Sequence, residues 1–522
     1  MNLLLTFQFR KLQNIYKQTQ PISMSLFVKK PMSILMAEAD DSEKGLKRTL
    51  GAGNLVALGI GAIIGAGLFV RTAAAAAQHA GPSVTLGFIV AAIGCAFAGL
   101  CYAEFASMIP IAGSAYTYSY ATMGEFIAWI IGWDLILEYG VGAATVGIAW
   151  SEYFNKLLGI FGLNIPYEWC HSPFEHSLAG VHGIMNIPAL FIIFLITMIL
   201  IRGTKGSALV NSLIVILKVA IVLIVIALGW SYIRPENHTP FIPEATTYVD
   251  PNGLPHNFGG IWGILGAAGV VFFAFIGFDA VSTAAQEAKN PKKDMPIGIL
   301  GSLAICTVLY ILFSYVLTGI ASVNDFRTVG KEASVSYAIE HMSGSMVNGI
   351  WIAKYQWLSN LVTVAILAGF SSVILVMLMG QSRVFYSMSK DGLVPKVFSE
   401  VHPKHRTPYK ANLIFLFVVG AFATFVPGDI VGEMTSIGTL FAFILVCAGV
   451  WILRVKQPGL QRQFKVPFVP LVSTLGIIVC LAMIAGLGWP NWLRLFGWLL
   501  IGLIIYFGYS RKNSKLRNPG KE

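Results

Sequence analysis

The chain has 522 residues, of which 56% are hydrophobic and only 12% are charged. Soluble globular domains carry about 25% charged residues, so this composition excludes them and indicates a polytopic, all-α membrane protein embedded in a lipid bilayer. The formal charge of +11 is distributed over short loops between apolar segments, and the sequence has no nucleic-acid-binding motif. We therefore expect no nucleic-acid partner.

The first 45 or so residues are polar and basic and have no secretory cleavage pattern. Met24 begins a second plausible start, so residues 1–23 are either a disordered tail or lie before the true start. We assign residues 1–50 to an N-terminal tail, 51–510 to a transmembrane domain and 511–522 to a C-terminal tail.

Twelve apolar segments follow the tail, each near or above the about 17 residues needed to cross a bilayer. In chain order, segments one to twelve lie at roughly 55–78, 83–108, 120–150, 186–202, 208–230, 262–287, 296–320, 356–387, 411–427, 431–454, 469–487 and 491–509. An even number of crossings puts both termini on the same side of the membrane.

Lysine and arginine predict the orientation. Loops on the side of the termini carry Arg202, Lys205, Lys289, Lys292, Lys293, Lys390, Lys396, Lys404, Arg406, Lys410, Arg454, Lys456, Arg462 and Lys465. The opposite loops carry mainly Lys156, Arg234, Arg327, Lys331 and Lys354. Because cytoplasmic loops are enriched in these residues, we expect a cell-membrane protein with both termini in the cytoplasm. Segments 157–185 and 231–261 are then outer loops.

The first informative stretch is LGIGAIIGAGLF at 58–69, which has four glycines in an apolar run. Glycine costs about 1 kcal/mol relative to alanine in a helix interior, so this cluster weakens the helix. Within a bilayer, unwound backbone is tolerated only where protein or a water-filled cavity satisfies it. The stretch is either a close helix–helix contact of the GxxxG type or a broken helix that binds a ligand.

The second stretch is VFFAFIGFDAVSTAAQE at 271–287, where Gly277 lies beside Asp279 in the middle of segment six. An uncompensated acidic residue deep in lipid costs about 2.5–3.5 kcal/mol on insertion scales, so Asp279 should face a cavity or a partner. Segments one and six are both interrupted by glycine and lie five segments apart. Such a pair is typical of an inverted-repeat transporter site, which favours binding over packing.

Lys218 lies almost at the centre of segment five, about ten residues from either end. That distance is about 15 Å along a helix, too far for the ammonium to reach an interface easily. Because burial disfavours the charged form of lysine, its charge becomes marginal near neutral pH. We interpret Lys218 as a proton carrier.

Four further carboxylates lie at membrane depth or near it, at Glu104, Glu125, Asp134 and Glu138. Asp134 and Glu138 share one helix face because they are four residues apart. Three alternatives stay open for the group: substrate ligands, counter-charges for Lys218, or carboxylates turned to water near helix ends.

The sequence lacks the patterns of membrane-embedded catalysis. No helix carries a His/Glu zinc pattern or a paired-carboxylate hydrolase pattern, and no P-loop is present. We expect neither an enzyme nor an ATP-driven motor, and no cofactor or metal.

Four long stretches resemble a known family. They read GIGAIIGAGLF in segment one, CYAEFASMIPIAGSAYTYSYATMGEFIAWIIGWDLILEYGVG across two and three, FFAFIGFDAVSTAAQEAKNPKKDMPIGI across six and seven, and MGQSRVFYSMSKDGLVPKVFSEVHPKHRTP after eight. In this order they resemble the amino acid–polyamine–organocation superfamily, and within it the cationic amino acid transporter branch and its bacterial relatives. The resemblance runs from about Gly45 to about Ser510.

The resemblance implies a five-plus-five inverted repeat, with repeat one at about 51–230, repeat two at about 262–454 and two added helices at 469–509. It implies an α-amino acid bound between the broken segments one and six. The substrate carboxylate would accept hydrogen bonds from backbone N–H groups, and the substrate ammonium would donate to backbone carbonyls. Phe275 or a neighbour would form an aromatic lid on the outer side. The residues so implicated are Ile60, Ile63, Gly65, Ala66, Gly67, Phe275, Ile276, Gly277, Phe278 and Ser282.

By the same resemblance, Lys218 matches a lysine that takes the place of a sodium ion in proton-coupled relatives. Glu125 matches an acidic residue implicated in recognition or coupling, a role also open to Asp279. Arg71 departs from the family pattern, where an apolar residue is usual, and we expect it near the outer vestibule.

The expected function is uptake of an L-amino acid with a proton, and the alternative is amino acid exchange without net proton coupling. A small membrane subunit stays open as a partner.

Overall fold

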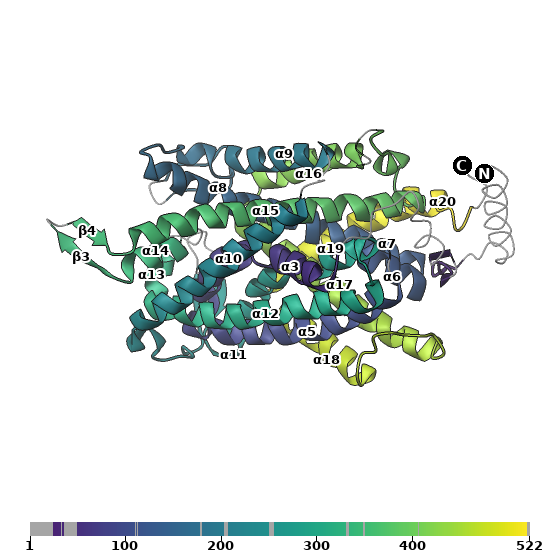
Figure 1. Cartoon of the computed structure of the whole chain (residues 1–522), viewed down its shortest axis with the longest axis horizontal. Coiled ribbons are helices and arrows are strands. Elements are labelled where there is room, and N and C mark those ends of the chain that lie inside the picture. Colours follow the sequence, from purple (N-terminus) through teal and green to yellow (C-terminus); the bar gives the residue numbers. More distant parts are fainter. Residues whose placement is uncertain are drawn as a thin grey trace.

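The computed structural model describes residues 25–518 apart from 33, 36–49, 110, 112, 178–179, 203–206, 250–254, 330–333, 348–349, 404 and 406 (Figure 1). The possible early start at residues 1–23 and most of the predicted N-terminal tail therefore lie outside the described residues. Four basic residues used for orientation also lie outside them: Lys205, Lys331, Lys404 and Arg406.

All twelve predicted apolar segments coincide with helical structure. The long helices are α3 (Ala52–Ile63), α5 (Val84–Met108), α7 (Glu125–Leu135), α8 (Gly142–Ile160), α9 (Ile187–Arg202), α10 (Ser207–Gly229), α11 (Gly260–Val271), α12 (Pro291–Ile320), α15 (Gln356–Lys390), α16 (Tyr409–Phe425), α17 (Gly428–Lys456), α18 (Val469–Gly486) and α19 (Trp489–Ile505). Nine helical spans in the described part are long and apolar enough to cross a membrane. The number of crossings and the inverted repeat remain predictions.

Shorter elements connect or extend these helices. They are α4 (Thr72–Ala75), α6 (Ser114–Thr122), α13 (Val323–Val329), α14 (Ser334–His341), α20 (Arg511–Asn513), the π-helical turns η2 (Gly67–Arg71), η3 (Ala76–Ala80), η5 (Ile136–Val141) and η12 (Tyr506–Ser510), and the 3₁₀ turns η4 (Gly81–Ser83), η6 (Tyr167–Trp169), η7 (Trp230–Tyr232), η8 (Pro235–His238), η9 (Phe272–Phe275), η10 (Asp279–Glu287) and η11 (Lys396–Ser399).

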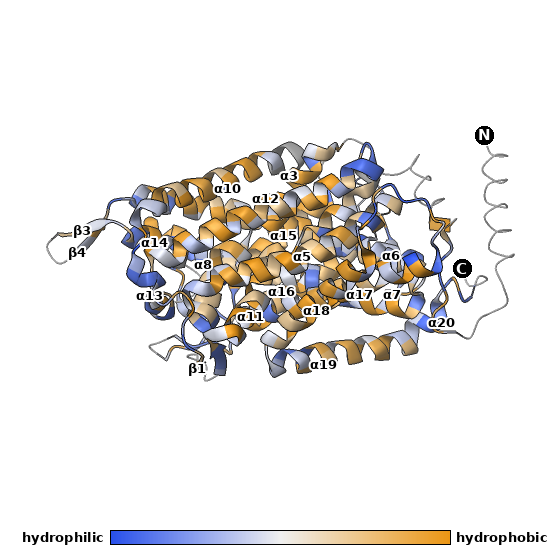
Figure 2. Cartoon of the chain, turned by 90° about the horizontal axis from the view of Figure 1, so that it is seen from below, coloured by the Kyte–Doolittle hydropathy of each residue, from blue (hydrophilic) through white to orange (hydrophobic). Residues whose placement is uncertain are grey.

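The helices form one elongated bundle whose surface is divided into three zones. Hydrophobic residues cover the middle of the long axis, and hydrophilic residues gather at its two ends (Figure 2). The helices are apolar on their exposed faces as well as their buried ones, as lipid contact requires. This division fits a molecule whose long axis crosses a bilayer.

The two ends of the bundle differ in their chain segments. One end, called the terminal end, carries the two ends of the described chain (Figure 1). The other, called the hairpin end, carries two antiparallel hairpins: β1 (Thr246–Val249) with β2 (Pro255–Phe258), and β3 (Gly344–Val347) with β4 (Ile350–Ala353). Arg327 fixes the first hairpin, because its guanidinium lies 4.2 Å from the Tyr248 ring centroid and 4.6 Å from that of Phe258.

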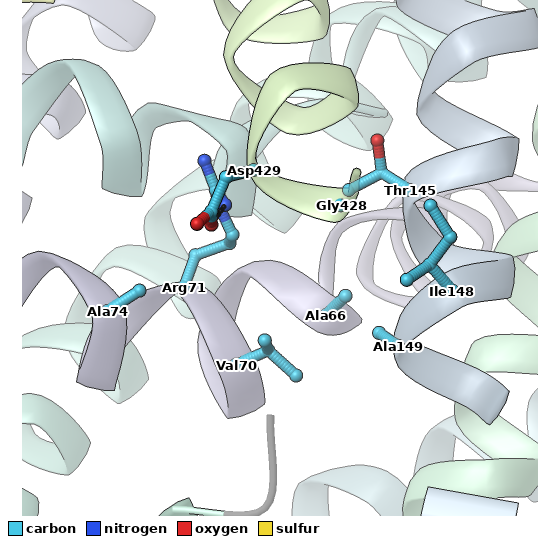
Figure 3. A pocket seen from close by; sticks show the side chains of 9 residues that line it. All are labelled: Ala66, Val70, Arg71, Ala74, Thr145, Ile148, Ala149, Gly428 and Asp429. Carbon is cyan, nitrogen blue, oxygen red and sulfur yellow. Dashed lines mark hydrogen bonds and ion pairs between the residues drawn. The ribbon is translucent and has the colours of Figure 1, made fainter. Parts of the chain in front are cut away.

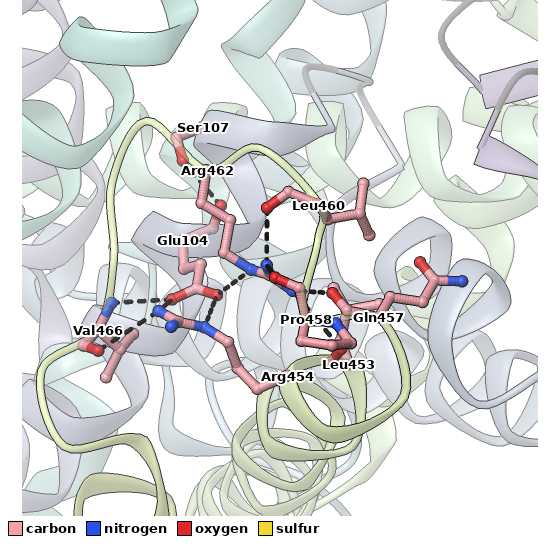
Figure 4. A network of polar contacts seen from close by, with 9 residues as sticks. All are labelled: Glu104, Ser107, Leu453, Arg454, Gln457, Pro458, Leu460, Arg462 and Val466. Atoms are coloured by element: carbon pink, nitrogen blue, oxygen red, sulfur yellow. Dashed lines mark hydrogen bonds and ion pairs between the residues drawn. The ribbon is translucent and has the colours of Figure 1, made fainter.

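Ion pairs that join distant segments close the terminal end. Glu104, at the end of α5, is 1% exposed and accepts hydrogen bonds from Arg454 Nε at 2.8 Å and Nη2 at 2.7 Å. Arg462 Nε lies 3.1 Å from the same carboxylate, and the Val466 N–H donates to it at 2.8 Å (Figure 4). These contacts fasten α5 to the end of α17 and the loop that follows it. The alternative of a carboxylate turned to water is wrong for Glu104.

Glu125 is equally enclosed at the start of α7. Its side chain is 0% exposed and forms an ion pair with Arg517 Nε at 2.5 Å. Ser514, Tyr120 and Tyr506 also donate to it. The C-terminal tail is therefore folded against segment three, and the water-facing alternative is wrong for Glu125 too.

Candidate functional site

Segment one is broken near its middle. Helix α3 ends at Ile63, Ile64 and Gly65 leave helical geometry, and a π-helical turn begins at Gly67. Apart from hydrogen bonds within the helices, no backbone oxygen of the described residues accepts from the N–H groups of Gly65, Ala66 or Gly67. Free N–H groups at the start of a helix attract anions. The break lies where the family resemblance implies binding of a carboxylate, and that binding stays a prediction.

Segment six is broken at the corresponding place. Helix α11 ends at Val271, a 3₁₀ turn runs to Phe275, and a second 3₁₀ stretch begins at Asp279. Gly277, between them, has φ of +113°, which side chains rarely adopt. This glycine is required by backbone conformation, so the interruption is built into the sequence.

The two broken stretches lie against each other. A Cβ atom added at Gly67 would be 2.1 Å from Ala274 Cα, and one at Gly277 would be 3.0 Å from the Ala62 carbonyl oxygen. Backbone atoms cannot yield as side-chain ends can. The close contact expected of the packing alternative is therefore present at Gly67, and ligand binding there stays a prediction.

Tyr310, in α12, connects the two breaks and was not identified from the sequence. Its hydroxyl lies 2.9 Å from the carbonyl oxygens of both Ile63 and Ala274. A hydroxyl has one proton, so it donates to one carbonyl at a time. The available signal was a tyrosine within the apolar run of segment seven, which does not distinguish a bridging hydroxyl from a packed ring.

Lys218 reaches the break in segment one from α10. Its Nζ donates hydrogen bonds of 2.9 Å to Gly61 O, Ile64 O and Ser372 Oγ. The side chain is 2% exposed, and Gly369 provides room for it, because a Cβ there would lie 2.7 Å from Lys218 Cε. The ammonium is bound to protein rather than to the membrane surface, which excludes snorkelling. Ser372 and Gly369, both in α15, were not identified from the sequence.

The other predicted residues of segment six are buried in the same region. Phe275 packs edge-on against Phe88 and Tyr310, at 6.2 and 5.2 Å between ring centroids. Ser282 Oγ donates to Ser114 Oγ at 3.0 Å, which joins segment six to α6. Ile60, Ile276 and Phe278 are also buried. The structure thus gathers the predicted substrate residues around the two breaks.

Asp279 and two carboxylates of segment three form a separate buried group. Asp279 accepts a hydrogen bond from the Tyr139 hydroxyl, and Glu138 lies beside Asp279. In the described part of the chain, no donor reaches either oxygen of Glu138 or of Asp134, or Oδ1 of Asp279. These carboxyls are therefore not counter-charges of Lys218, whose donors are used by carbonyls and Ser372. Glu125 lies apart, with Arg517.

The chain has extensive similarity to known transport proteins. A family profile described as amino acid permease matches residues 50–509. The branched-chain amino acid permease BcaP of Bacillus subtilis (strain 168) is 45% identical over 492 residues, which is 94% of this chain and 99% of BcaP. The methylthioribose transporter of the same organism is 41% identical over the same shares of both chains. The vacuolar cationic amino acid transporter 4 of Arabidopsis thaliana is 32% identical over 83% of this chain and 68% of its own.

These matches confirm the family resemblance inferred from the four motifs. They cover both broken segments, the lysine between them and all the long helices. The relatives are transporters, and none of those named is an enzyme. The chain therefore belongs to the amino acid permease family of the amino acid–polyamine–organocation superfamily, and it is a multi-pass membrane transport protein.

Proposed function

We propose that this permease takes up a neutral, aliphatic L-amino acid together with a proton, by alternating access between the two membrane faces. The observation that carries the proposal is the position of Lys218, whose ammonium binds the carbonyls at the break in segment one. We propose the terminal end as the cytoplasmic end, since the ion pairs that close it include the basic residues Arg454 and Arg462.

The hydrogen bonds of Lys218 support its role in coupling. An ammonium has three N–H donors, and Gly61, Ile64 and Ser372 use all three. A neutral amine has only two N–H donors, so loss of the proton frees at least one acceptor. Protonation of Lys218 therefore favours the broken geometry of segment one seen here, and deprotonation weakens it. A proton gradient acting on this residue would then bias the conformation of the substrate site.

The substrate would span the two breaks with its charged groups. Its carboxylate would accept from the N–H groups of Gly65, Ala66 and Gly67. Its ammonium would bind carbonyls at the C-terminal ends of the broken helices, near Ile60, Ile63 and Phe275–Phe278. The hydroxyl of Tyr310 lies within hydrogen-bond distance of the carbonyl oxygens of Ile63 and Ala274, so it would donate to Ala274 when the substrate ammonium binds at Ile63.

The preference for an aliphatic side chain rests on the surroundings and on one relative. Phe275, Ile276 and Phe278 are apolar and buried, and an apolar pocket suits a branched side chain. The 45% identical relative is named for branched-chain amino acids. The relative named for methylthioribose supplies the competing substrate. Thermal stabilisation of the purified protein should be greater with leucine, isoleucine or valine than with lysine, arginine or methylthioribose.

Glu138 and Asp279 are proposed as a second proton-holding group. Two neighbouring buried carboxyls without a cation repel each other when both are ionised, so they are suited to share a proton. Because they lie on segments three and six, a change in their protonation would alter the contact between these two segments.

The experiment is uptake of labelled leucine into proteoliposomes driven by an imposed pH gradient. We expect Lys218→Met to bind leucine in the thermal-shift assay but to lose accumulation driven by the gradient. Ser372→Ala is the matched variant, because it removes one acceptor and leaves the ammonium, and it should retain accumulation. Gradient-driven accumulation in Lys218→Met would refute proton coupling through this residue. Release of preloaded leucine only when external amino acid is present would instead identify an exchanger.

A further inference from the structure

A short turn in the connection between α8 and α9 brings two histidines together. The turn runs from Glu175 to Gly183 and is called the histidine turn. Its two arms are antiparallel, because the Ser177 N–H donates to the Val181 carbonyl at 2.9 Å and the Gly183 N–H donates to the Glu175 carbonyl at 3.0 Å. These two hydrogen bonds set the register of the arms.

His176 and His182 face each other between those hydrogen bonds. Such a non-hydrogen-bonded pair places both side chains on one face, closer together than in a hydrogen-bonded pair. The ring centroids are 5.2 Å apart, and the ring planes are tilted by 58°. Both side chains are exposed, and within the described residues neither ring forms a hydrogen bond or an ion pair. Their ring nitrogens are therefore available to a ligand.

The separation of the two rings suits a metal ion. Imidazole nitrogen is a ligand of zinc, copper and nickel. An ion about 2.1 Å from one nitrogen of each ring, with a tetrahedral angle between them, holds the ring centres roughly 5 Å apart. The observed 5.2 Å agrees with this spacing. The turn thus presents two ligands at the separation that a tetrahedral ion requires.

The neighbouring side chains leave the other coordination positions to water. His171 is engaged elsewhere, since its Nε2 pairs with Glu152 at 3.0 Å and its Nδ1 lies 3.1 Å from a backbone carbonyl oxygen. Glu175 lies on the face opposite His176, because successive residues of an extended arm alternate. No group of three possible ligands occurs in the part of the chain that the structure describes. The pair therefore suits an exchangeable ion and not a permanent structural one.

The ion pair of segment one shows the contrast. Figure 3 shows Arg71 beside Asp429, and Arg71 Nη1 donates to Asp429 Oδ1 at 3.1 Å. The hollow that they line has room for about one water molecule. Because guanidinium and carboxylate carry opposite charges, each satisfies the other without a ligand. The histidine pair has no such internal partner, and its ring nitrogens are open to an ion from the medium.

The position of the turn lets an ion reach it. The end of α8 before this connection lies at the hairpin end, since Lys156 forms an ion pair of 3.0 Å with Glu340, close to β3. This end lies opposite the one proposed as cytoplasmic. The expectation of no metal rested on patterns within helices, and this pair lies in a loop.

We propose that His176 and His182 form a surface site for one divalent transition-metal ion of the kind that imidazole binds, Zn²⁺ or Cu²⁺. The ion bridges the two arms of the histidine turn, and water completes its coordination. The inference goes beyond the proposed function and depends neither on the transported substrate nor on Lys218.

The test is a Cu²⁺ titration of the purified protein, prepared without a polyhistidine tag and followed by electron paramagnetic resonance. The tightest-bound ion should bind at micromolar concentration and show hyperfine coupling to two imidazole nitrogens. His176→Gln and His182→Gln should each weaken binding at least about tenfold and leave coupling to one nitrogen, because the second imidazole acts as an intramolecular ligand. Zn²⁺ should compete for the site, whereas Mg²⁺ should not, since it prefers oxygen ligands.

Two further histidines provide the background and the control. The titration uses a His402→Gln background, because His402 and His405 are a second close pair, with ring centroids 4.8 Å apart. His171→Gln is the matched control, since it removes a histidine of the same loop that is already paired with Glu152. It should change neither the affinity nor the coupling to two nitrogens.

Three outcomes would overturn the site. The first is tight binding that survives the double variant His176→Gln/His182→Gln, and the second is coupling to a single nitrogen in the parent. The third is binding at millimolar concentration only, which would identify an adventitious ion. An equal loss of affinity in His171→Gln would also count against it, because the loss would then come from rearrangement of the loop. Both histidines of the pair are exposed, so their variants should unfold at the same temperature as the parent without metal. Failure of leucine binding or of gradient-driven uptake would refute the proposed function and leave this site intact.

Discussion

Buried carboxylates are paired with cations at the terminal end of the bundle, whereas those in its middle have no cation beside them among the described residues. Glu104 has two arginines and a backbone N–H, and Glu125 has an arginine and three hydroxyls. In the middle, Glu138 lies beside another carboxyl with no cation among the described residues. A fully paired charge fixes neighbouring segments in place, whereas a carboxyl without a cation can gain or lose a proton without breaking an ion pair. The paired carboxylates of the terminal end therefore have a structural role, and the unpaired ones in the middle support the proposed coupling role.

The largest effect is expected from Glu104→Gln. This change leaves Arg462, whose side chain is 2% exposed, buried without its counter-charge. Removing one partner of a buried ion pair costs about 3–5 kcal/mol, so the apparent unfolding temperature should fall sharply. Glu400→Gln, which breaks the exposed pair with Lys410, is the control and should have little effect. Only a small decrease in the unfolding temperature of Glu104→Gln would contradict a structural role for the ion pairs at the terminal end.

Gly67→Ala should come next, because it forces two backbones apart. The new Cβ would lie 2.1 Å from Ala274 Cα, and we expect a loss of stability of about 1–3 kcal/mol or more. Gly65→Ala meets only the end of the Val373 side chain, at 3.0 Å, and should cost less. Both are measured by thermal unfolding in detergent. Gly65 is therefore the better position to probe ligand binding, and equal losses at the two positions would contradict the close contact.

His171 tests an ion pair at the hairpin end. Burial works to lower its pKa, but the hydrogen bond to Glu152 and the charge of that carboxylate outweigh burial and raise the pKa to about 9. Because the folded-state pKa exceeds the unfolded value of about 6.5, this stabilisation is complete below pH 6.5 and is lost as pH rises through 9. Solvent screening limits it to about 1 kcal/mol. Unfolding temperatures measured from pH 6 to 10 should show this loss, and His171→Gln should flatten it; an unchanged profile would exclude the ion pair.

The smallest change in stability is expected from Glu138→Gln. No cation loses its partner, and the amide has nearly the same shape, so the loss should be below about 1 kcal/mol. Compared with Glu104→Gln, this variant tests whether the loss of an ion pair, and not burial alone, determines the loss of stability. Equal destabilisation by the two changes would break the contrast between the regions. Its gradient-driven uptake should fall although the protein stays folded.

Local patterns in the sequence were sufficient for the membrane segments and the two breaks. Hydropathy sets which stretches enter a bilayer, and glycine weakens a helix wherever it stands, so 58–69 and Gly277 could be identified without any contact. The depth of Lys218 followed from its place in segment five. The order of the motifs was enough to identify the family.

Only the tertiary structure decided the partners. Glu125 and Arg517 are almost 400 positions apart in the chain, and Arg71 and Asp429 are 358 apart, so no local pattern could pair them. A tyrosine in an apolar run says nothing of the two carbonyls between which Tyr310 lies. Hydropathy and helix-breaking act residue by residue and are legible in the sequence. The pairing of charges and the touching of backbones depend on which helices become neighbours, and that is settled only when the bundle is packed.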